Sequence, residues 1–233
     1  MDPNLIATGA VWYVVFLFSL TCHEAAHALV AKWGGDPTAA LGGQVTLNPI
    51  PHMQREIFGT IIVPIASYAL GGWMIGWASA PYDPLWRDRH PRRAAWMAIA
   101  GPAANLSLML VAVLLIRLLM FAGVLVPPES LRFDHVVSAA LPGIGEGVAF
   151  FLSILFSLNL LLAVFNLLPL PPLDGHAAVG LVLPANVARR FAALTRNPTL
   201  AIVGLILCWK VFPYIFGPIF GLSLALIYLG VVS

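Results

Sequence analysis

Charged residues and cysteines are both scarce in this sequence. Only 9% of its 233 residues are charged, whereas 60% are hydrophobic, and the net charge is +2. Soluble domains carry about 25% charged residues, so this composition excludes an ordinary soluble domain and predicts a polytopic membrane protein. So small a net charge predicts no nucleic acid as a partner. The expected environment is the lipid bilayer.

The two cysteines indicate neither a disulfide framework nor a redox motif. Cys22 and Cys208 each lie in a long apolar stretch, and neither has a second cysteine two or three residues away. We expect both to be small buried side chains. No basic segment and no small-residue cleavage site accompany the first apolar run, so we expect that run to be retained as a membrane span. The sequence also lacks an internal repeat, which gives an inverted-repeat transporter no support.

Long apolar segments determine the expected fold class. Several of them are long enough to cross the ~30 Å hydrocarbon core of a bilayer as helices. We predict an all-α polytopic membrane protein with about four to six transmembrane helices. One domain is expected over residues 1–233, with its core at 4–180 and a C-terminal membrane segment at 198–233 that crosses once or twice. The apolar segments are residues 4–33, 57–80, 94–126, 147–168 and 199–233.

The region after the first helix is expected to be irregular. Residues 36–56 lack helical periodicity, and Val45-Thr46-Leu47 stands between Gly-Gly and Asn-Pro turn signals. This pattern predicts a short strand, which would belong to a membrane-associated β-hairpin. Residues 57–80 are interrupted by Pro64 and by Gly71-Gly72. We expect this stretch to be a re-entrant helical hairpin that turns near the two glycines.

The basic loops predict the orientation. Residues 87–93 (RDRHPRR) and 188–196 are the most basic segments, and the positive-inside rule places both in the cytoplasm. The helix at 94–126 then runs outward and the helix at 147–168 returns. If the first helix runs inward, residues 57–80 enter and leave the membrane on the same face. We therefore expect a multi-pass protein of the cell membrane whose active site opens toward the cytoplasm.

The segment HEAAH puts three ionisable groups inside the first apolar helix. Residues four apart share a helix face, so His23 and His27 present two imidazoles to one metal ion. Glu24 lies beside that face, in the HExxH arrangement of zinc peptidases. The structural alternative is that neighbouring helices satisfy all three groups. Because their burial in hydrocarbon is costly without a cation, the pattern predicts a metal site with Glu24 as the catalytic base.

A catalytic zinc ion normally takes three protein ligands and leaves one position for water. The candidates for the third ligand are His52, Glu146, Asp174 and His176. Asp174 is favoured because prolines break the preceding helix and Gly175 lets the backbone turn, which aims a carboxylate inward. The alternative for Asp174 is an N-cap role that opens a short helix at 175–183. For His176 the alternatives are a fourth ligand, a proton shuttle or a partner of the ligands.

Three motifs in this order resemble those of the site-2 protease family of intramembrane zinc metalloproteases. They are HEAAH at 23–27, AGPAANL at 100–106 and NLLPLPPLDG at 166–175. The resemblance extends from about residue 21 to residue 180, and it is to the compact type without a PDZ or CBS domain. It implies that His23, His27 and Asp174 bind one Zn²⁺ per chain and that Glu24 activates the water.

Asn166, Asn105 and His176 are candidates for contact with the substrate. The resemblance implies that Asn166 lies near the metal, where its amide would hold a substrate carbonyl or an oxyanion. Hydrogen bonding between helices is the alternative for Asn166. Asn105 is more typical of packing and helix support than of chemistry. The chain has Ser79 where similar small members have lysine, and it lacks their Asp-Pro after His52, so their substrate preferences do not transfer.

The expected function is that of an intramembrane zinc endopeptidase. Its partners would be membrane-anchored proteins or peptides, cut within or next to their transmembrane segments in regulated intramembrane proteolysis. The alternative is a metal transporter or metal-binding membrane protein, which shares the buried ligands but does not need the glutamate between the histidines. No GxSxG-like turn accompanies the serines, which disfavours a serine protease. The sequence predicts neither the substrate's identity nor the oligomeric state.

Overall fold

Four long apolar helices dominate the computed structural model, which describes residues 3–194 and 197–230. Among these residues, four helices are long and apolar enough to cross a membrane. They are α1 (Pro3–Trp33), α6 (Pro91–Phe121), α7 (Ile144–Asn166) and α10 (Pro198–Tyr228). The expected all-α polytopic membrane protein is confirmed. Residues 195–196 and 231–233, which end the predicted basic segment and the predicted C-terminal segment, lie outside the described residues.

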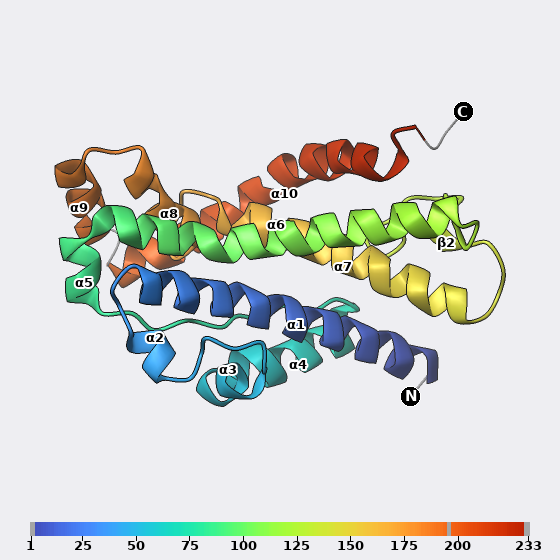
Figure 1. The fold of residues 1–233 in the computed structure, drawn as a ribbon, viewed down its shortest axis with the longest axis horizontal. Coiled ribbons are helices and arrows are strands. Elements are labelled where there is room, and N and C mark those ends of the chain that lie inside the picture. The colour runs from blue at the N-terminus through green and yellow to red at the C-terminus, as the bar shows by residue number, and fades with distance from the viewer. Residues whose placement is uncertain (1–2, 195–196, 231–233) are drawn as a thin grey trace.

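The core of the molecule lies where α1, α6 and α7 pack together. Figure 1 shows α6 running alongside both α1 and α7, and α1 also contacts α7. Phe16 of α1, Ile116 of α6 and Phe156 of α7 are almost completely buried in this cluster. Because lipid tails are as apolar as these side chains, close packing rather than exclusion of water stabilises the contact. The three helices form the support for the polar groups described below.

α10 is an outer helix, and its C-terminal end is attached to the core. Arg117 of α6 donates to the backbone carbonyls of Leu226, Ile227 and Leu229 at 3.1, 3.2 and 2.9 Å. These carbonyls lie at or just beyond the C-terminal end of the helix, where the helix dipole favours a cation. The C-terminal segment, expected to cross once or twice, is one continuous helix with Pro213 and Pro218 inside it.

The connection between α6 and α7 contains the small β-sheet of the described residues. α6 was expected to reach residue 126, but it ends at Phe121. Gly123, with φ of 71°, turns the chain into β1 (Leu125–Val126). This strand pairs antiparallel with β2 (Ser138–Ala139), Leu125 opposite Ala139. The last apolar residues of the predicted helix therefore form a strand at the end of the bundle.

The strand predicted at residues 45–47 is wrong. These residues form bends between two short helices, α2 (Thr38–Leu41) and α3 (Ile50–Arg55). Within the part of the chain that the structure describes, no strand lies beside them. A strand of three residues needs a partner for its backbone groups. Here the carbonyl of Thr46 instead lies 3.1 Å from the ring nitrogen Nε2 of His52.

Residues 57–83 leave the core and return to it, as a re-entrant segment would. A π-helical turn (Phe58–Ile62) continues into α4 (Val63–Gly71), and Gly72, with φ of 75°, reverses the chain. The turn lies at the predicted glycines, but the return limb (residues 73–83) is extended rather than helical. Trp77 N donates to the carbonyl of Gly59 at 3.1 Å. A side chain at Gly59 or Gly76 would collide with the backbone of the opposite limb, so the two glycines permit this contact.

Hydrogen bonds of Asp36 and Glu56 hold the beginning and the end of residues 57–83 close together. The buried carboxylate of Asp36 accepts from Thr38 N at 3.0 Å and from Asp83 N at 2.8 Å. Ser79 Oγ donates to Glu56 Oε1 at 2.7 Å. Burial by itself raises the pKa of Asp36, but these hydrogen bonds outweigh it and hold the pKa below its usual value. The entry and the exit of residues 57–83 therefore lie close together.

Short helices follow α7 at its C-terminal end. Asp174 is the first residue of α8, and Leu173 occupies the N-cap position without a side-chain cap. The N-cap alternative for Asp174 is therefore wrong, which leaves its carboxylate available for another contact. The short helix predicted at 175–183 is divided in two. The elements after α7 are α8 (Asp174–Ala178), a 3-10 turn (Val179–Leu181) and α9 (Ala185–Leu194). One more short helix, α5 (Pro84–Arg89), precedes α6.

Candidate metal centre

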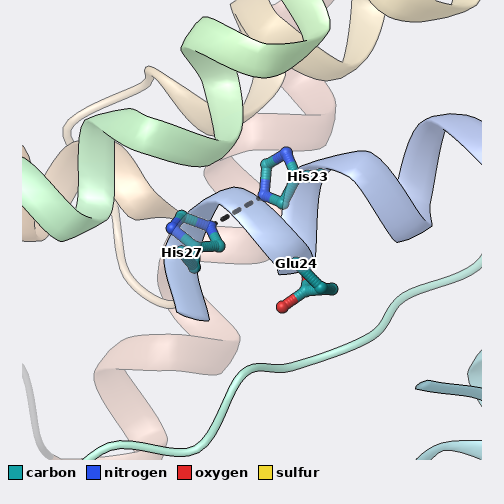
Figure 2. Close-up of side chains that lie close together, drawn as sticks. All are labelled: His23, Glu24 and His27. Atoms are coloured by element: carbon teal, nitrogen blue, oxygen red, sulfur yellow. Dashed lines mark hydrogen bonds between the residues drawn. The ribbon is translucent and has the colours of Figure 1, made fainter. Parts of the chain in front are cut away.

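One turn of α1 presents both histidines of HEAAH to the interior. His23 and His27 are each 5% exposed, and their Nε2 atoms lie 3.0 Å apart (Figure 2). The four-residue spacing puts them on one face of the helix, as predicted. The two rings meet edge to face, so both Nε2 atoms point to one location between α1 and α6. Two imidazoles that converge in this way form half of a metal-binding site.

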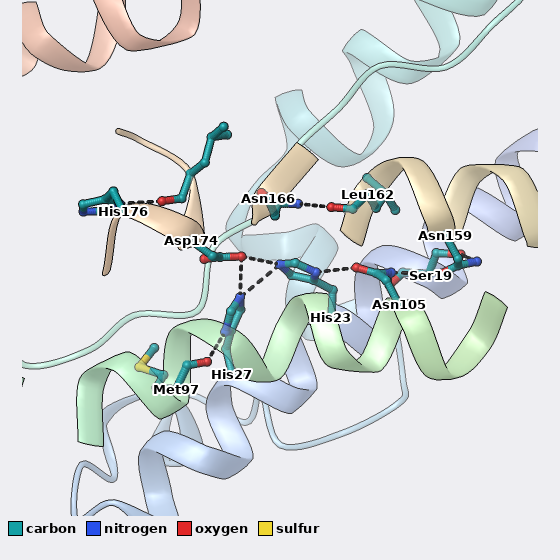
Figure 3. A network of polar contacts seen from close by, with 11 residues as sticks. Ser19, His23, His27, Met97, Asn105, Asn159, Leu162, Asn166, Asp174 and His176 are labelled. Atoms are coloured by element: carbon teal, nitrogen blue, oxygen red, sulfur yellow. Dashed lines mark hydrogen bonds and ion pairs between the residues drawn. The ribbon is translucent and has the colours of Figure 1, made fainter. Parts of the chain in front are cut away.

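The other ring nitrogen of each histidine is held by α6. His23 Nδ1 lies 2.6 Å from Asn105 Oδ1, and His27 Nδ1 lies 2.7 Å from the carbonyl of Met97 (Figure 3). Both partners are oxygen acceptors, so each Nδ1 carries the proton. Each Nε2 then offers a lone pair to the location where the rings converge. This is the tautomer that a metal-ligating histidine needs.

Asp174 adds a carboxylate oxygen at the same location. Its Oδ2 lies 3.1 Å from His23 Nε2 and 3.3 Å from His27 Nε2 (Figure 3). Donor atoms at about 2.0–2.1 Å from a tetrahedral zinc ion lie roughly 3.3 Å from one another. The three observed separations of 3.0, 3.1 and 3.3 Å are close to that spacing. The residues present therefore fit a zinc ion.

The charge balance of this cluster favours a cation. Two lone pairs and a carboxylate in a buried location would repel one another unless a positive charge lay between them. A carboxylate binds a metal ion in its ionised form, and Asp174 would bind in that form here.

Glu24 lies beside the histidines, and one of its two carboxylate oxygens has no partner. The residue is 3% exposed, and its buried Oε2 has no hydrogen-bond partner among the described residues. One oxygen of Glu24 and one nitrogen of each histidine lie within 4.8 Å of one another. Figure 2 shows the carboxylate projecting from a different side of α1 than the two rings. An unpaired buried carboxylate is costly, and a water or substrate group beside the metal would satisfy it.

Comparison with known proteins identifies the family. The model of peptidase family M50 matches residues 11–211, which includes both halves of the cluster. The chain belongs to peptidase family M50, the site-2 proteases. It is therefore a zinc metalloprotease and a multi-pass membrane protein. The resemblance drawn from the three motifs is confirmed.

The chain is also similar to curated proteins. YwhC of Bacillus subtilis (strain 168), named a candidate zinc metalloprotease, is 35% identical over 175 residues, which are 75% of this chain and 69% of YwhC. Rip2 of Mycobacterium tuberculosis (strain H37Rv), named likewise, is 30% identical over 207 residues, which are 89% of this chain and 70% of Rip2. No solved structure matches the chain significantly.

The second motif of this M50 chain supplies both the support of His23 and the space beside it. Gly101 of α6 faces both histidines, and an ideal Cβ at this position would lie 2.5 Å from His23 Nε2 and as close to His27 Nε2. Asn105, one turn later, is fully buried, and its side chain is hydrogen bonded to His23 and Asn159. Its amide is therefore engaged within the protein rather than free to face a substrate.

The other candidates for the third ligand do not join the cluster. The ring of His52 contacts the carbonyl of Thr46. Glu146 is exposed in the first turn of α7, roughly 30 Å along the helix from Asn166. His176 Nδ1 contacts the carbonyl of Leu173, and Figure 3 shows its ring on the far side of α8 from His23. Among these four candidates, the contacts with both histidines belong to Asp174 alone.

Asn166 ends α7 close to the third motif. Its Nδ2 donates to the carbonyl of Leu162 at 3.0 Å, one turn back in its own helix. This bond uses one of the two N–H groups of Nδ2, which leaves the second N–H and the amide oxygen for other contacts. No hydrogen bond joins Asn166 to another helix in the described structure, so bonding between helices does not explain it.

Sequence reasoning missed Ser19 and Asn159, two polar residues in apolar helices. Both are completely buried, and both belong to the hydrogen-bonded group around Asn105. A buried polar residue in a membrane-spanning segment is itself a signal, because it is tolerated only when it is paired. The sequence does not show which partner each of them has.

Proposed function

We propose that the chain is an intramembrane endopeptidase that hydrolyses peptide bonds within or next to transmembrane segments of membrane-anchored proteins or peptides. In this proposal one zinc ion per chain is bound by His23, His27 and Asp174, and Glu24 is the catalytic base. Its setting is regulated intramembrane proteolysis in the cell membrane. Residues 1–233 act as one domain. The convergence of three metal donors beside Glu24, with both histidines and Glu24 inside a helix long enough to span a membrane, carries the proposal.

The roles of the residues follow from their positions. A bound zinc ion supplies Lewis acidity toward a carbonyl and a water that loses its proton near neutral pH. The histidines and Asp174 orient that ion through contacts that α6 and α8 fix. Glu24 takes the proton of the attacking water on its unpaired carboxylate and delivers it to the leaving amine. A role for Asn166 at the oxyanion would use the second N–H of its Nδ2, which the bond to Leu162 leaves available.

The depth of the site supports cleavage within the membrane. His23 lies ten residues before the end of α1 at Trp33, which is roughly 15 Å along the helix axis. A substrate helix must become extended there, because helical carbonyls are hydrogen bonded within the helix. In this proposal water reaches the site from the end of the molecule where α1 ends and where α5 and α9 lie (Figure 1). Their basic residues favour the cytoplasm for that end, so the active site opens toward the cytoplasm.

The test compares the wild type with Glu24→Gln after reconstitution in liposomes together with single-span membrane proteins. New peptide termini within or beside the spans are expected with the wild type and not with Glu24→Gln, although both variants retain zinc. Removal of zinc by a chelator should stop cleavage, and added zinc should restore it. Cleavage that persists in Glu24→Gln, or that is confined to sites far from any span, would contradict the proposal.

A further inference from the structure

A chain of buried polar side chains leads from His23 away from the proposed metal centre. It runs from Asn105 of α6 to Asn159 of α7 and on to Ser19 of α1, and each of these three residues is 0% exposed (Figure 3). Polar groups at such positions in membrane-spanning helices are tolerated only when they are hydrogen bonded. Asn105, Asn159 and Ser19 thus form one hydrogen-bonded group from three helices. Its first member, Asn105, contacts His23, a proposed zinc ligand.

The backbone carbonyl of Leu155, at the end of this group farthest from His23, determines the direction of the hydrogen bonds along it. The carbonyl of Leu155 can only accept, so Asn159 Nδ2 faces it at 2.8 Å and also donates to Ser19 Oγ at 2.9 Å. Asn159 Oδ1 therefore accepts from Asn105 Nδ2 at 2.9 Å. Asn105 Oδ1 is left to accept from His23 Nδ1 at 2.6 Å. The proton on His23 Nδ1 is thus determined from two helices away.

The two histidines differ in what holds them. Met97 supports His27 with a backbone carbonyl, which cannot become a donor. Asn105 supports His23 with an amide, which can rotate by half a turn and present Nδ2 instead of Oδ1. After such a rotation His23 would accept at Nδ1 and carry its proton on Nε2, where it could not bind a metal. Asn105 Nδ2 donates to Asn159 Oδ1 at 2.9 Å and to the backbone carbonyl of Ser19 at 3.4 Å, and the shorter of these contacts, with Asn159, opposes that rotation most.

We propose that Asn159 is a positioning residue for the metal centre: through Asn105 it keeps the proton of His23 on Nδ1 and the lone pair of Nε2 directed at the metal. This inference rests on the proposed zinc site. It assigns a function to a residue of α7 that contacts neither the metal donors nor Glu24. Loss of a residue that orients a metal-bound histidine typically weakens metal binding about 10- to 100-fold.

The test is a double-mutant cycle on zinc affinity, measured by competition with a chelator. Asn159→Leu is expected to weaken zinc binding about 10- to 100-fold. In an Asn105→Asp background the same change should have little effect, because a carboxylate presents an acceptor to His23 in either orientation. A loss of equal size in both backgrounds, or unchanged affinity in Asn159→Leu, would overturn the proposal.

Ser153→Ala is the matched control. Ser153 lies on the same helix, is equally buried, and accepts a hydrogen bond from Val136 N at 3.1 Å, outside the group of His23. Its removal should lower thermal stability and leave zinc affinity at the wild-type value. A second readout is the ¹⁵N spectrum of His23 in zinc-free protein above neutral pH, where Asn159→Leu should move the proton from Nδ1 toward Nε2, and an unchanged spectrum would overturn the proposal. Absence of zinc binding by the wild type would contradict the proposed function, whereas the ¹⁵N result tests the positioning role separately.

Discussion

Substitution of Gly101 by alanine tests the location of the metal with the smallest possible change. A methyl group at this position would lie 2.5 Å from His23 Nε2 and as close to His27 Nε2, whereas real Cβ atoms essentially never approach closer than 3.0 Å. A zinc ion at about 2.0–2.1 Å from both nitrogens would compete with the methyl group for the same space. The helices α1 and α6 must therefore separate, or the two rings must rotate away from each other.

Either response disturbs both imidazoles at once. To lengthen the contact from 2.5 Å to 3.0 Å, the groups must move by at least 0.5 Å. A displacement of this size in the support of a metal ligand is expected to weaken zinc binding about 10- to 100-fold, or roughly 1.4–2.8 kcal/mol. Proteolytic activity at limiting zinc should fall by the same factor, and excess zinc should restore part of it.

The assay measures zinc affinity by chelator competition, together with the thermal stability of the zinc-free protein. Gly221→Ala in α10 is the matched control, because nothing lies within 4 Å of a Cβ at that position. Alanine there should leave zinc affinity unchanged and stabilise the helix by up to about 1 kcal/mol. Wild-type zinc affinity in Gly101→Ala would refute the location of the metal between the two Nε2 atoms and α6.

Three further predictions concern the third ligand, the topology and acid sensitivity. Asp174→Ala should lose bound zinc and activity, and a variant that keeps both would move the third ligand elsewhere. Single cysteines placed at Gln54 and Arg89, with the native cysteines replaced by alanine, should react with an impermeant thiol reagent from one face of the membrane. A single cysteine at Leu141 should react from the other face. Reaction at positions 54 and 89 from opposite faces would make residues 57–83 a true span. The lowered pKa of Asp36 contributes stability that is present above about pH 4 and lost as the pH falls further, so thermal unfolding should be less acid-sensitive in Asp36→Asn; an unchanged pH profile would contradict this.

Local sequence was sufficient for the long helices and for half of the candidate site. A helix long enough to span a bilayer is recognisable from a continuous apolar run, because its backbone hydrogen bonds lie within the segment. The same regularity places His23 and His27 on one face before any tertiary contact is known. The turn at Gly71-Gly72 was also predictable, since glycine adopts the positive φ of 75° found at Gly72 without strain.

Tertiary structure decided every feature that depends on a partner distant in sequence. The predicted strand at residues 45–47 did not form because no strand among the described residues pairs with it, and the return limb lies close to the π-helical turn because Gly59 and Gly76 leave room for the contact. Four residues were candidates to join the histidines, and only the packing of α8 on α6 brought Asp174 to them. The contribution of Asn159 was hidden for the same reason, because the direction of a hydrogen-bond chain is determined by acceptors on other helices. Sequence periodicity defines faces within one helix, whereas distances between helices arise from the packing of all of them.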